Sequence, residues 1–424
     1  MAAEAVSCFE FFGHPGNERS PLRLDGRRVV MERKPQVYLA RLVSRGQLDR
    51  SLRSSRRERD ASIDCHRKRE SAGVVGVLTD QIHAPRGMYP ERGLDIAGHQ
   101  RKRTARIVWG LGLSKRATSG LVDVVCHDRS MSRAELPSGI ELQYETFGNS
   151  DDPTLLLVNG YTSQLTGWDE GLCALFVDQG LHVVRYDNRD VGLSSKLTGV
   201  VQPAEVLAAV LANDPVPPVP YTLSHMAADG GGLLDHLGVE RAHVAGMSMG
   251  GMIVQMMAIE HPSRVASLTS IMSNTGNPAV GAPTRAARAV ILAPAPTDRA
   301  AYIEDSVSAA VWASKRYVDH DAMRARAAAN YDRAFFPEGA PRQLAAIYAT
   351  GDRSGRLRAL DVPTLVIHGR DDTLITPSGG ADTAQLITGS KYLLLADMGH
   401  DLPVPLWPVF VEAIGGHIRI AEAA

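Results

Sequence analysis

Cysteine is scarce in this 424-residue chain, and long apolar runs are missing from it. The four cysteines are too few and too scattered for a disulfide framework or a zinc ribbon (Cys8, Cys65, Cys126, Cys173). No stretch of about 18 uncharged apolar residues is present, so the sequence predicts no membrane span. The first 30 residues lack the charged start and apolar core of an export signal. We therefore expect a reducing, cytoplasmic setting.

The net formal charge is only −1, but the two signs are unevenly distributed along the chain. Residues 1–130 hold 25 Lys and Arg against 15 Asp and Glu, whereas residues 131–424 hold 21 against 32. Parts of opposite sign indicate different origins or roles. The composition, 44% hydrophobic and 22% charged, excludes collagen and a wholly disordered chain.

Residues 1–130 show no sustained helical or strand periodicity. An arginine-rich arm can bind nucleic acid through phosphate contacts, but no recognition fold accompanies these arginines and aromatic residues are sparse. We therefore expect a disordered extension and no nucleic-acid partner. Because orderly patterning begins at Met131, a further hypothesis makes Met131 the natural start. Tryptic peptides from before Met131 in the native protein would contradict that hypothesis.

Strand patterns alternate with helix patterns from residue 133 onward. Period-two alternation at 139–147 predicts a half-exposed antiparallel strand. Apolar runs predict further strands at 154–158, 182–186, 242–245, 265–272, 364–368 and 391–395, and helical spacing predicts helices at 223–237 and 249–259. This alternation predicts an α/β fold, with a mostly parallel sheet between helices on both faces. Active sites in such sheets lie beyond the carboxyl ends of the strands.

The alternation stops between residues 275 and 356. This stretch is rich in alanine, helical in character and interrupted by prolines. We interpret it as a helical cap that shapes a pocket over the sheet. The core is then expected to comprise residues 131–274 and 357–424.

The strongest motif is Gly246-Met247-Ser248-Met249-Gly250. The G-x-S-x-G pattern alone also occurs by chance in unrelated sequences. The alternative to a nucleophile is a serine that caps a helix in a glycine-rich turn. Here the motif follows an apolar strand and opens a helix, which is the context of a nucleophile elbow. Gly246 and Gly250 are expected because bulkier side chains would clash across the tight turn. The sequence therefore predicts Ser248 as a nucleophile.

A serine hydroxyl needs an adjacent base, and the base needs a carboxylate to hold its tautomer. In folds with this elbow, the acid and then the base follow the nucleophile along the chain. Asp371 and Asp372 both follow the strand at 364–368, and we prefer Asp372, the fourth residue of Gly-x-x-Asp. His400 follows the strand at 391–395 and is the expected base.

An oxyanion requires two backbone donors that point at one place. One expected donor is the N–H of Met249, which directly follows the nucleophile. The other is assigned to the N–H of Tyr161, in the loop after the strand at 154–158.

These residues together resemble the α/β-hydrolase superfamily, over roughly residues 133–420. Residues 187–194 are similar to the D-x-R-G-x-G-x-S segment of its cap-bearing members, and the segments around Trp168, 185–187 and 398–403 resemble the aclacinomycin methylesterase branch and related actinobacterial carboxylesterases. The resemblance implies the triad Ser248, Asp372 and His400, with no metal and no organic cofactor. One departure is Asn159-Gly160, where the superfamily usually has His-Gly. Another is the run of three glycines, 230–232, inside a predicted helix.

The favoured function is a serine esterase that acts on a small, apolar ester. Three alternatives use the same triad on another bond: a C–C hydrolase, an amidase or a cofactor-free perhydrolase. A fourth is a ligand-binding protein with slow turnover. The serine at the elbow argues against epoxide hydrolase and haloalkane dehalogenase chemistry, which uses aspartate there. Acyl specificity, alcohol specificity and oligomeric state stay open.

Overall fold

The computed structural model describes residues 130–424, so the expectations for residues 1–129 lie outside the described part of the chain. Eight strands form one sheet in the order β1-β2-β4-β3-β5-β6-β7-β8. β2 pairs antiparallel with β1 and β4, and all other neighbours are parallel. The strands are β1 (Ser130–Glu135), β2 (Glu141–Phe147), β3 (Thr154–Val158), β4 (His182–Tyr186), β5 (Ala242–Met247), β6 (Val265–Ile271), β7 (Thr364–Gly369) and β8 (Lys391–Leu395).

The central strands are buried on both faces, which explains their continuous apolar runs. In β3, Leu156 and Val158 enter one hydrophobic core, whereas Leu155 and Leu157 enter the other. Successive side chains of a strand point to opposite faces, so one five-residue run supplies both cores. The sheet is therefore a central layer between two packed cores.

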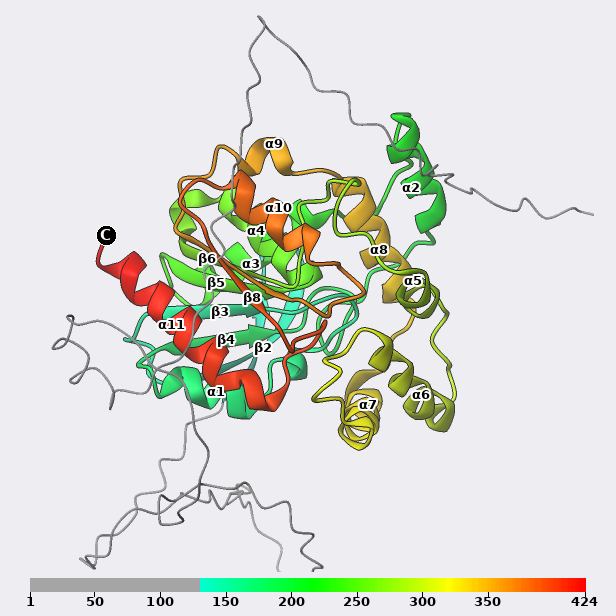
Figure 1. Cartoon of the computed structure of the whole chain (residues 1–424), viewed down its shortest axis with the longest axis horizontal. Helices are drawn as coiled ribbons and strands as arrows, with labels where there is room; N and C mark the ends of the chain where they lie inside the picture. The colour runs from blue at the N-terminus through cyan, green and yellow to red at the C-terminus, as the bar shows by residue number, and fades with distance from the viewer. Residues whose placement is uncertain (1–129) are drawn as a thin grey trace, which may run out of the picture. The chain divides into compact units, whose positions relative to one another are not determined.

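Helices cover both faces of the sheet (Figure 1). α1 (Glu170–Val177) and α11 (Trp407–Glu422) pack on one face, where Phe176 and Phe410 are fully buried. α3 (Leu223–His236) and α4 (Met249–Glu260) pack on the other face with Leu233 and Met256. α9 (Ser354–Leu357) and α10 (Ser378–Leu386) complete that second layer. The predicted mostly parallel sheet with helices on both faces is confirmed.

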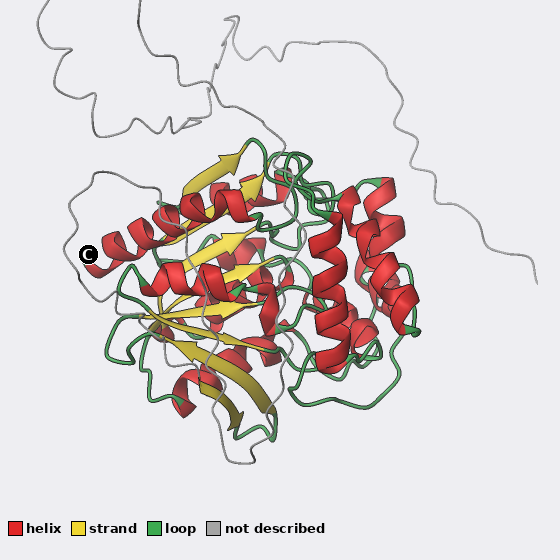
Figure 2. Cartoon of the chain, turned by 90° about the horizontal axis from the view of Figure 1, so that it is seen from below, coloured by secondary structure: helices red, strands yellow, loops and turns green. Residues whose placement is uncertain are grey.

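A group of helices inserted between β6 and β7 lies at one end of the strands, as Figures 1 and 2 show. It contains α5 (Arg285–Ile291), α6 (Arg299–Asp305), η3 (Ser306–Val311), α7 (His320–Ala334) and α8 (Gly339–Thr350). We call these elements the cap. α2 (Pro203–Ala212), which precedes the nucleophile in the chain, packs against α8. Three short 3-10 turns stand outside the cap: η1 (Leu165–Gly167), η2 (Pro262–Arg264) and η4 (Val404–Leu406).

The structure corrects the expected exposure of β2. The strand is antiparallel as predicted, but its polar residues Gln143 and Glu145 are buried instead of facing solvent. Glu145 accepts a 3.0 Å hydrogen bond from Arg185 Nε of the neighbouring β4. A buried carboxylate is tolerated when an opposite charge and hydrogen bonds accompany it, so the period-two pattern here reflects a buried polar row.

Of the three glycines in α3, Gly230 lies against α4, whereas a Cβ on Gly231 would meet no atom within 4 Å. A Cβ on Gly230 would lie 2.9 Å from Met257 Sδ of α4, closer than real side chains approach. α3 and α4 thus pack closely, which offsets part of the roughly 1 kcal/mol that glycine costs relative to alanine in a helix. Strand β1 and helix α2 were not predicted from the sequence.

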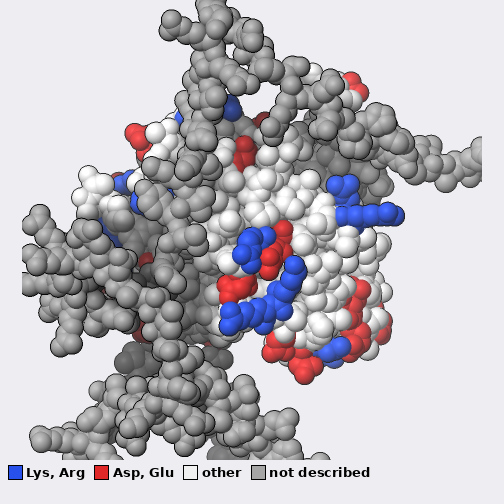
Figure 3. Space-filling model, viewed as in Figure 1, with Lys and Arg blue, Asp and Glu red and all other residues white. Residues whose placement is uncertain are grey.

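Surface charges on the cap occur largely as pairs of opposite sign. Arg299 lies 2.7 Å from Asp332, and Arg324 lies 3.0 Å from Glu304, each pair joining α6 to α7. In the space-filling view, a mixed group of acidic and basic side chains lies at the centre of the face, a basic group lies towards the right edge and a mostly acidic group lies at the lower right (Figure 3). Among the described helices, none combines the length and apolarity that crossing a membrane would require.

Candidate active site

Ser248 occupies a sharp turn between β5 and α4. Its backbone has φ 56° and ψ −122°, a conformation that residues with side chains rarely adopt. A Cβ on Gly246 would overlap the carbonyl of Gly250, and a Cβ on Gly250 would overlap the carbonyl of Val158. Both glycines are therefore required by the close approach of backbone to backbone. The Ser248 N–H donates to Ile271 O at 2.9 Å, which ties the turn to β6.

Three polar side chains from separate loops meet at the carboxyl ends of the strands. His400 Nε2 lies 2.9 Å from Ser248 Oγ, and His400 Nδ1 lies 2.7 Å from Asp372 Oδ2. Asp372 follows β7 and His400 follows β8, while Ser248 follows β5. The Asp372 side chain is fully buried and that of His400 is 8% exposed. The structure thus brings together the three residues that the sequence analysis singled out.

The Asp372 carboxylate is held on both oxygens. Oδ1 accepts the N–H groups of Leu374 at 2.8 Å and Ile375 at 2.9 Å. Oδ2 faces His400 and lies 3.4 Å from Nε2 of His368. Burial alone raises the pKa of Asp372, but His400 and His368 outweigh it and lower the pKa to about 2. The carboxylate is therefore ionised at neutral pH.

Asp371, the alternative acid, points elsewhere. Its Oδ1 lies 3.7 Å from Arg370 Nε, and its side chain remains 23% exposed. Its backbone N–H donates to Met398 O at 3.0 Å, so this residue links the loop after β7 to the loop after β8.

The loop after β3 passes over the elbow. A Cβ on Gly160 would lie 3.2 Å from Ser248 Cβ, so only a residue without a side chain fits comfortably there. Tyr161 follows directly, and Met249 begins α4 on the other side of Ser248. Tyr161 thus adjoins in sequence a residue that lies against the elbow, and Met249 adjoins Ser248 itself. Burial and, less strongly, Tyr348 raise the pKa of Tyr161 to about 12, so its phenol is neutral at neutral pH.

Gln343 of α8 holds this loop from the cap side. Its Oε1 accepts the Thr162 N–H at 2.8 Å, and its Nε2 donates to Arg189 O at 3.0 Å. Thr162 has φ 56°, a left-handed conformation that the hydrogen bond helps to stabilise. Asn188 Nδ2 donates to Asn159 O at 3.1 Å on the sheet side of the same loop. No pattern in the sequence pointed to Gln343.

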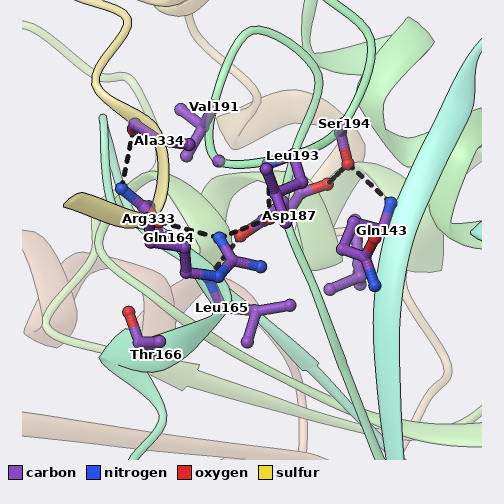
Figure 4. A network of polar contacts seen from close by, with 12 residues as sticks. Gln143, Gln164, Leu165, Thr166, Asp187, Val191, Leu193, Ser194, Arg333 and Ala334 are labelled. Carbon is purple, nitrogen blue, oxygen red and sulfur yellow. Dashed lines mark hydrogen bonds and ion pairs between the residues drawn. The ribbon is translucent and has the colours of Figure 1, made fainter. Parts of the chain in front are cut away.

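Asp187, at the end of β4, connects the same region to α7 (Figure 4). Its carboxylate accepts the N–H groups of Leu165 at 2.6 Å and Leu193 at 2.8 Å, and Arg333 Nη1 lies 2.8 Å from Oδ2. Arg333 Nη1 also donates to Gln164 Oε1 at 2.7 Å. Burial raises the pKa of Asp187, while Arg333 and the two backbone donors oppose that effect.

A second arginine of the cap pairs with the same segment. Arg342 of α8 lies 2.8 Å from Asp190 Oδ2, and both side chains are buried. Tyr221 donates to the same carboxylate oxygen at 2.7 Å. Residues 187–190 thus anchor two cap helices beside the site. The sequence analysis noted this segment only for its resemblance to a family motif and missed both arginine partners.

A surface hollow of about 310 Å³ lies beside α3 and η2, away from these residues. Leu136, His225, Asp229 and Arg264 are among the residues that line it, whereas Ser248, Asp372 and His400 are not. Within residues 130–424, no cluster of three or more His, Cys, Asp and Glu side chains has the arrangement of a metal site.

Comparison with known proteins identifies the class. The model of the alpha/beta hydrolase fold family matches residues 153–404, more than half of the chain. The chain therefore belongs to the α/β-hydrolase family, and the resemblance inferred from its motifs is confirmed.

The relatives include hydrolases of esterase type. Rhodomycin D methylesterase DnrP of Streptomyces peucetius is 27% identical over 316 residues, covering 66% of this chain and 96% of the relative. 3-Oxoadipate enol-lactonase 2 of Acinetobacter baylyi is 27% identical over 256 residues, covering 60% and 85%. Among solved structures, the enol-lactonase from Burkholderia xenovorans LB400 has a TM-score of 0.54 and 24% identity, covering 68% of this chain and all of that one. That last likeness establishes the fold.

Proposed function

We propose that the protein is a serine hydrolase that cleaves carboxylic esters through an acyl-enzyme. Ser248 is the nucleophile, His400 the general base and Asp372 the carboxylate that orients the imidazole. The proposal rests on one observation: the continuous hydrogen-bonded series from Ser248 Oγ through both ring nitrogens of His400 to Asp372. A hydroxyl, an imidazole and an ionised carboxylate in this order form the arrangement that activates a serine.

In the acylation half-reaction, Ser248 Oγ attacks the ester carbonyl carbon and His400 Nε2 takes the hydroxyl proton. The carbonyl oxygen becomes an oxyanion, which the N–H groups of Met249 and Tyr161 stabilise. The bond to the alkoxy oxygen then breaks, and His400 Nε2 gives its proton to the departing alcohol. Asp372 stays ionised throughout and stabilises the imidazolium.

In the deacylation half-reaction, water attacks the acyl carbon while His400 Nε2 accepts its proton. The bond to Ser248 Oγ breaks, the serine recovers its proton from His400, and the carboxylic acid leaves. Every step uses the chain's own groups and water, so the proposal includes no metal or organic cofactor. The scarcity of cysteine supports a cytoplasmic setting.

One feature favours an ester bond, and another favours apolar surroundings for it. The relatives include a methylesterase and an enol-lactonase, whose names designate ester and lactone bonds. The phenol next to the elbow, Tyr161, is neutral and packs against the apolar core. Burial of a charged substrate beside such groups would be costly.

The decisive variant is Ser248→Ala. We expect kcat for a short-acyl nitrophenyl ester to fall by a factor on the order of 10⁵–10⁶, because the nucleophile is removed. Labelling by a fluorophosphonate probe should disappear in parallel. Ser390→Ala is the matched control, since Ser390 lies in the turn before β8 and its hydroxyl bonds only to Ala384 O at 2.6 Å. Undiminished turnover by a folded Ser248→Ala protein refutes the proposal.

The bond that is cleaved is tested with wild-type protein and a panel of matched ester, amide and diketone substrates. An ester hydrolase should turn over the ester fastest. Faster cleavage of the diketone or amide would assign the same residues to another bond. Tight binding with negligible turnover of every member would indicate a ligand-binding protein.

A further inference from the structure

The loop that carries His400 is bonded to the cap as well as to the sheet. The cap chain after η3, residues 312–314, runs beside residues 399–401. His400 N–H donates to Trp312 O at 2.7 Å, and Gly399 N–H donates to Ser314 Oγ at 2.9 Å. Ser314 N–H donates to Asp401 Oδ1 at 3.0 Å, and Ser314 Oγ donates to the same carboxylate. We call these five residues the clasp.

The two segments of the clasp are in direct backbone contact. A Cβ on Gly399 would overlap the Trp312 carbonyl oxygen and the carbonyl carbon of Ala313, so no other residue fits at position 399 without movement. Ser314 is 0% exposed and Gly399 is buried. Hydrogen bonds in such a water-excluded contact are stronger than those at a surface.

The Ser314 hydroxyl is the centre of the clasp because it uses both of its capacities. It donates its one proton to Asp401 and accepts the Gly399 N–H. The same carboxylate also receives the Ser314 backbone N–H. Ser314 therefore binds the backbone of Gly399 and the side chain of Asp401, the two residues that flank His400.

The sheet side of this loop is held one residue earlier. Asp371 N–H donates to Met398 O at 3.0 Å, and Gly369 of β7 lies against the Met398 and Gly399 carbonyls. The backbone N–H groups of Gly399 and His400, in contrast, donate to residues of the cap. The position of the imidazole thus depends on a chain segment inserted between β6 and β7.

We propose that Ser314 and Asp401 are positioning residues for His400, and that they make catalytic competence depend on a seated cap. This inference rests on the proposed function, in which His400 is the base. With the cap seated, His400 Nε2 lies 2.9 Å from Ser248 Oγ. When the cap lifts, residues 399–401 lose their partners, and the imidazole loses its alignment with the nucleophile. An open cap that admits substrate is then an inactive state.

The test compares Ser314→Ala and Asp401→Asn with Tyr317→Phe. The first two remove or weaken the clasp. The third removes a 2.7 Å hydrogen bond from Tyr317 to Asp397, which joins the same cap segment to the same loop but lies outside the clasp. We expect both clasp variants to lose about 10- to 100-fold in kcat, because small misplacements of a catalytic group have effects of that size. KM should stay within about threefold, and Tyr317→Phe should resemble wild type.

A second readout separates positioning from simple destabilisation. The rate constant for inactivation by a fluorophosphonate, measured well below each variant's melting temperature, should fall with kcat because it needs an aligned base. The double variant should lose no more than the worse single variant, since both remove one unit.

Two outcomes overturn the inference. One is a kcat within twofold of wild type in both clasp variants. The other is a loss of activity that matches the unfolded fraction seen by circular dichroism. If Ser248→Ala remains active, the proposed function itself fails; if Ser248→Ala is inactive and the clasp variants are fully active, only this inference fails.

Discussion

Ser248, the proposed nucleophile, has a strained backbone conformation. A positive φ at a residue with a side chain typically costs about 1–3 kcal/mol, and here φ is 56°. The conformation persists because β5 and α4 pack on either side and Gly246 and Gly250 leave no room for relaxation. The strained turn lifts the hydroxyl toward the imidazole of His400.

The two adjacent aspartates offer a paired test at this scale. Asp372→Asn should lower kcat by about 10³–10⁴-fold, because an amide cannot hold the imidazole in the required tautomer. Asp371→Asn, in contrast, should leave kcat within about twofold of wild type, since the Asp371 side chain points away from His400. Steady-state kinetics on the nitrophenyl ester measure both. Equal losses in the two variants would contradict the assignment of the acid.

The candidate catalytic residues, which follow strands, could be found from the sequence. The cap residues that form hydrogen bonds and ion pairs with the loops of the site could not. Ser248, Asp372 and His400 each follow a strand with an apolar run, and the carboxyl ends of parallel strands meet at one edge of a sheet. Gln343, Ser314 and Arg333 lie in an insertion without periodic pattern, and their partners are far away along the chain. No local rule links such residues before the fold is known.

Among the elements, the strands with continuous apolar runs were the most predictable, since β3, β4 and β8 have the predicted bounds. α3 and α4 lie within one or two residues of their predicted bounds. β2 was misjudged in exposure because the partner of Glu145, Arg185, lies on a strand that follows much later. Strand polarity reports burial only when the neighbouring strand supplies no buried charge.

Helix α11 contains a histidine that should make stability depend on pH. His417 Nε2 lies 3.2 Å from Pro363 O, and burial lowers the pKa of His417 to about 4. In the unfolded chain this histidine takes up a proton near pH 6.5. Between about pH 6.5 and 4 the unfolded state binds more protons, so the stability present above pH 6.5 is lost as the pH falls through that window.

We therefore expect His417→Gln to flatten the pH dependence of unfolding. Between pH 7 and pH 4.5, wild type should lose more of its free energy of unfolding than the variant, by about 1–3 kcal/mol. Urea titrations followed by circular dichroism at the two pH values measure the difference. His320→Gln, at an exposed position at the start of α7, is the matched control. Identical pH slopes for wild type and His417→Gln would exclude this role.

At the scale of the whole molecule, two arginine–aspartate pairs with buried carboxylates fasten the cap to the core. Arg333 and Arg342 come from α7 and α8, and both partners, Asp187 and Asp190, come from the segment after β4. The cap also contacts the core at residues 162–166 and at the clasp. These attachments adjoin loops of the candidate site.

Removal of one arginine should leave a buried charge without its partner. We expect Arg333→Met to lower the free energy of unfolding by about 3 kcal/mol, because an uncompensated buried carboxylate is strongly unfavourable. The double variant Arg333→Met/Asp187→Asn should regain part of the loss. Urea unfolding measures both, and the exposed Arg299→Met is the control that should leave the midpoint almost unchanged. No difference between Arg333→Met and that control would contradict the anchoring role.

The glycine at position 399 has a consequence for protein engineering. The backbone at Gly399 is in direct contact with the backbone of residues 312–314. It therefore accommodates only the observed path of that segment of the cap. A chimera that exchanges residues 275–356 for the insertion of another hydrolase, in order to change substrate range, would have to reproduce that path at residues 312–314. A chimera with a different backbone path at residues 312–314 would have new pocket walls, but its His400 would be misaligned.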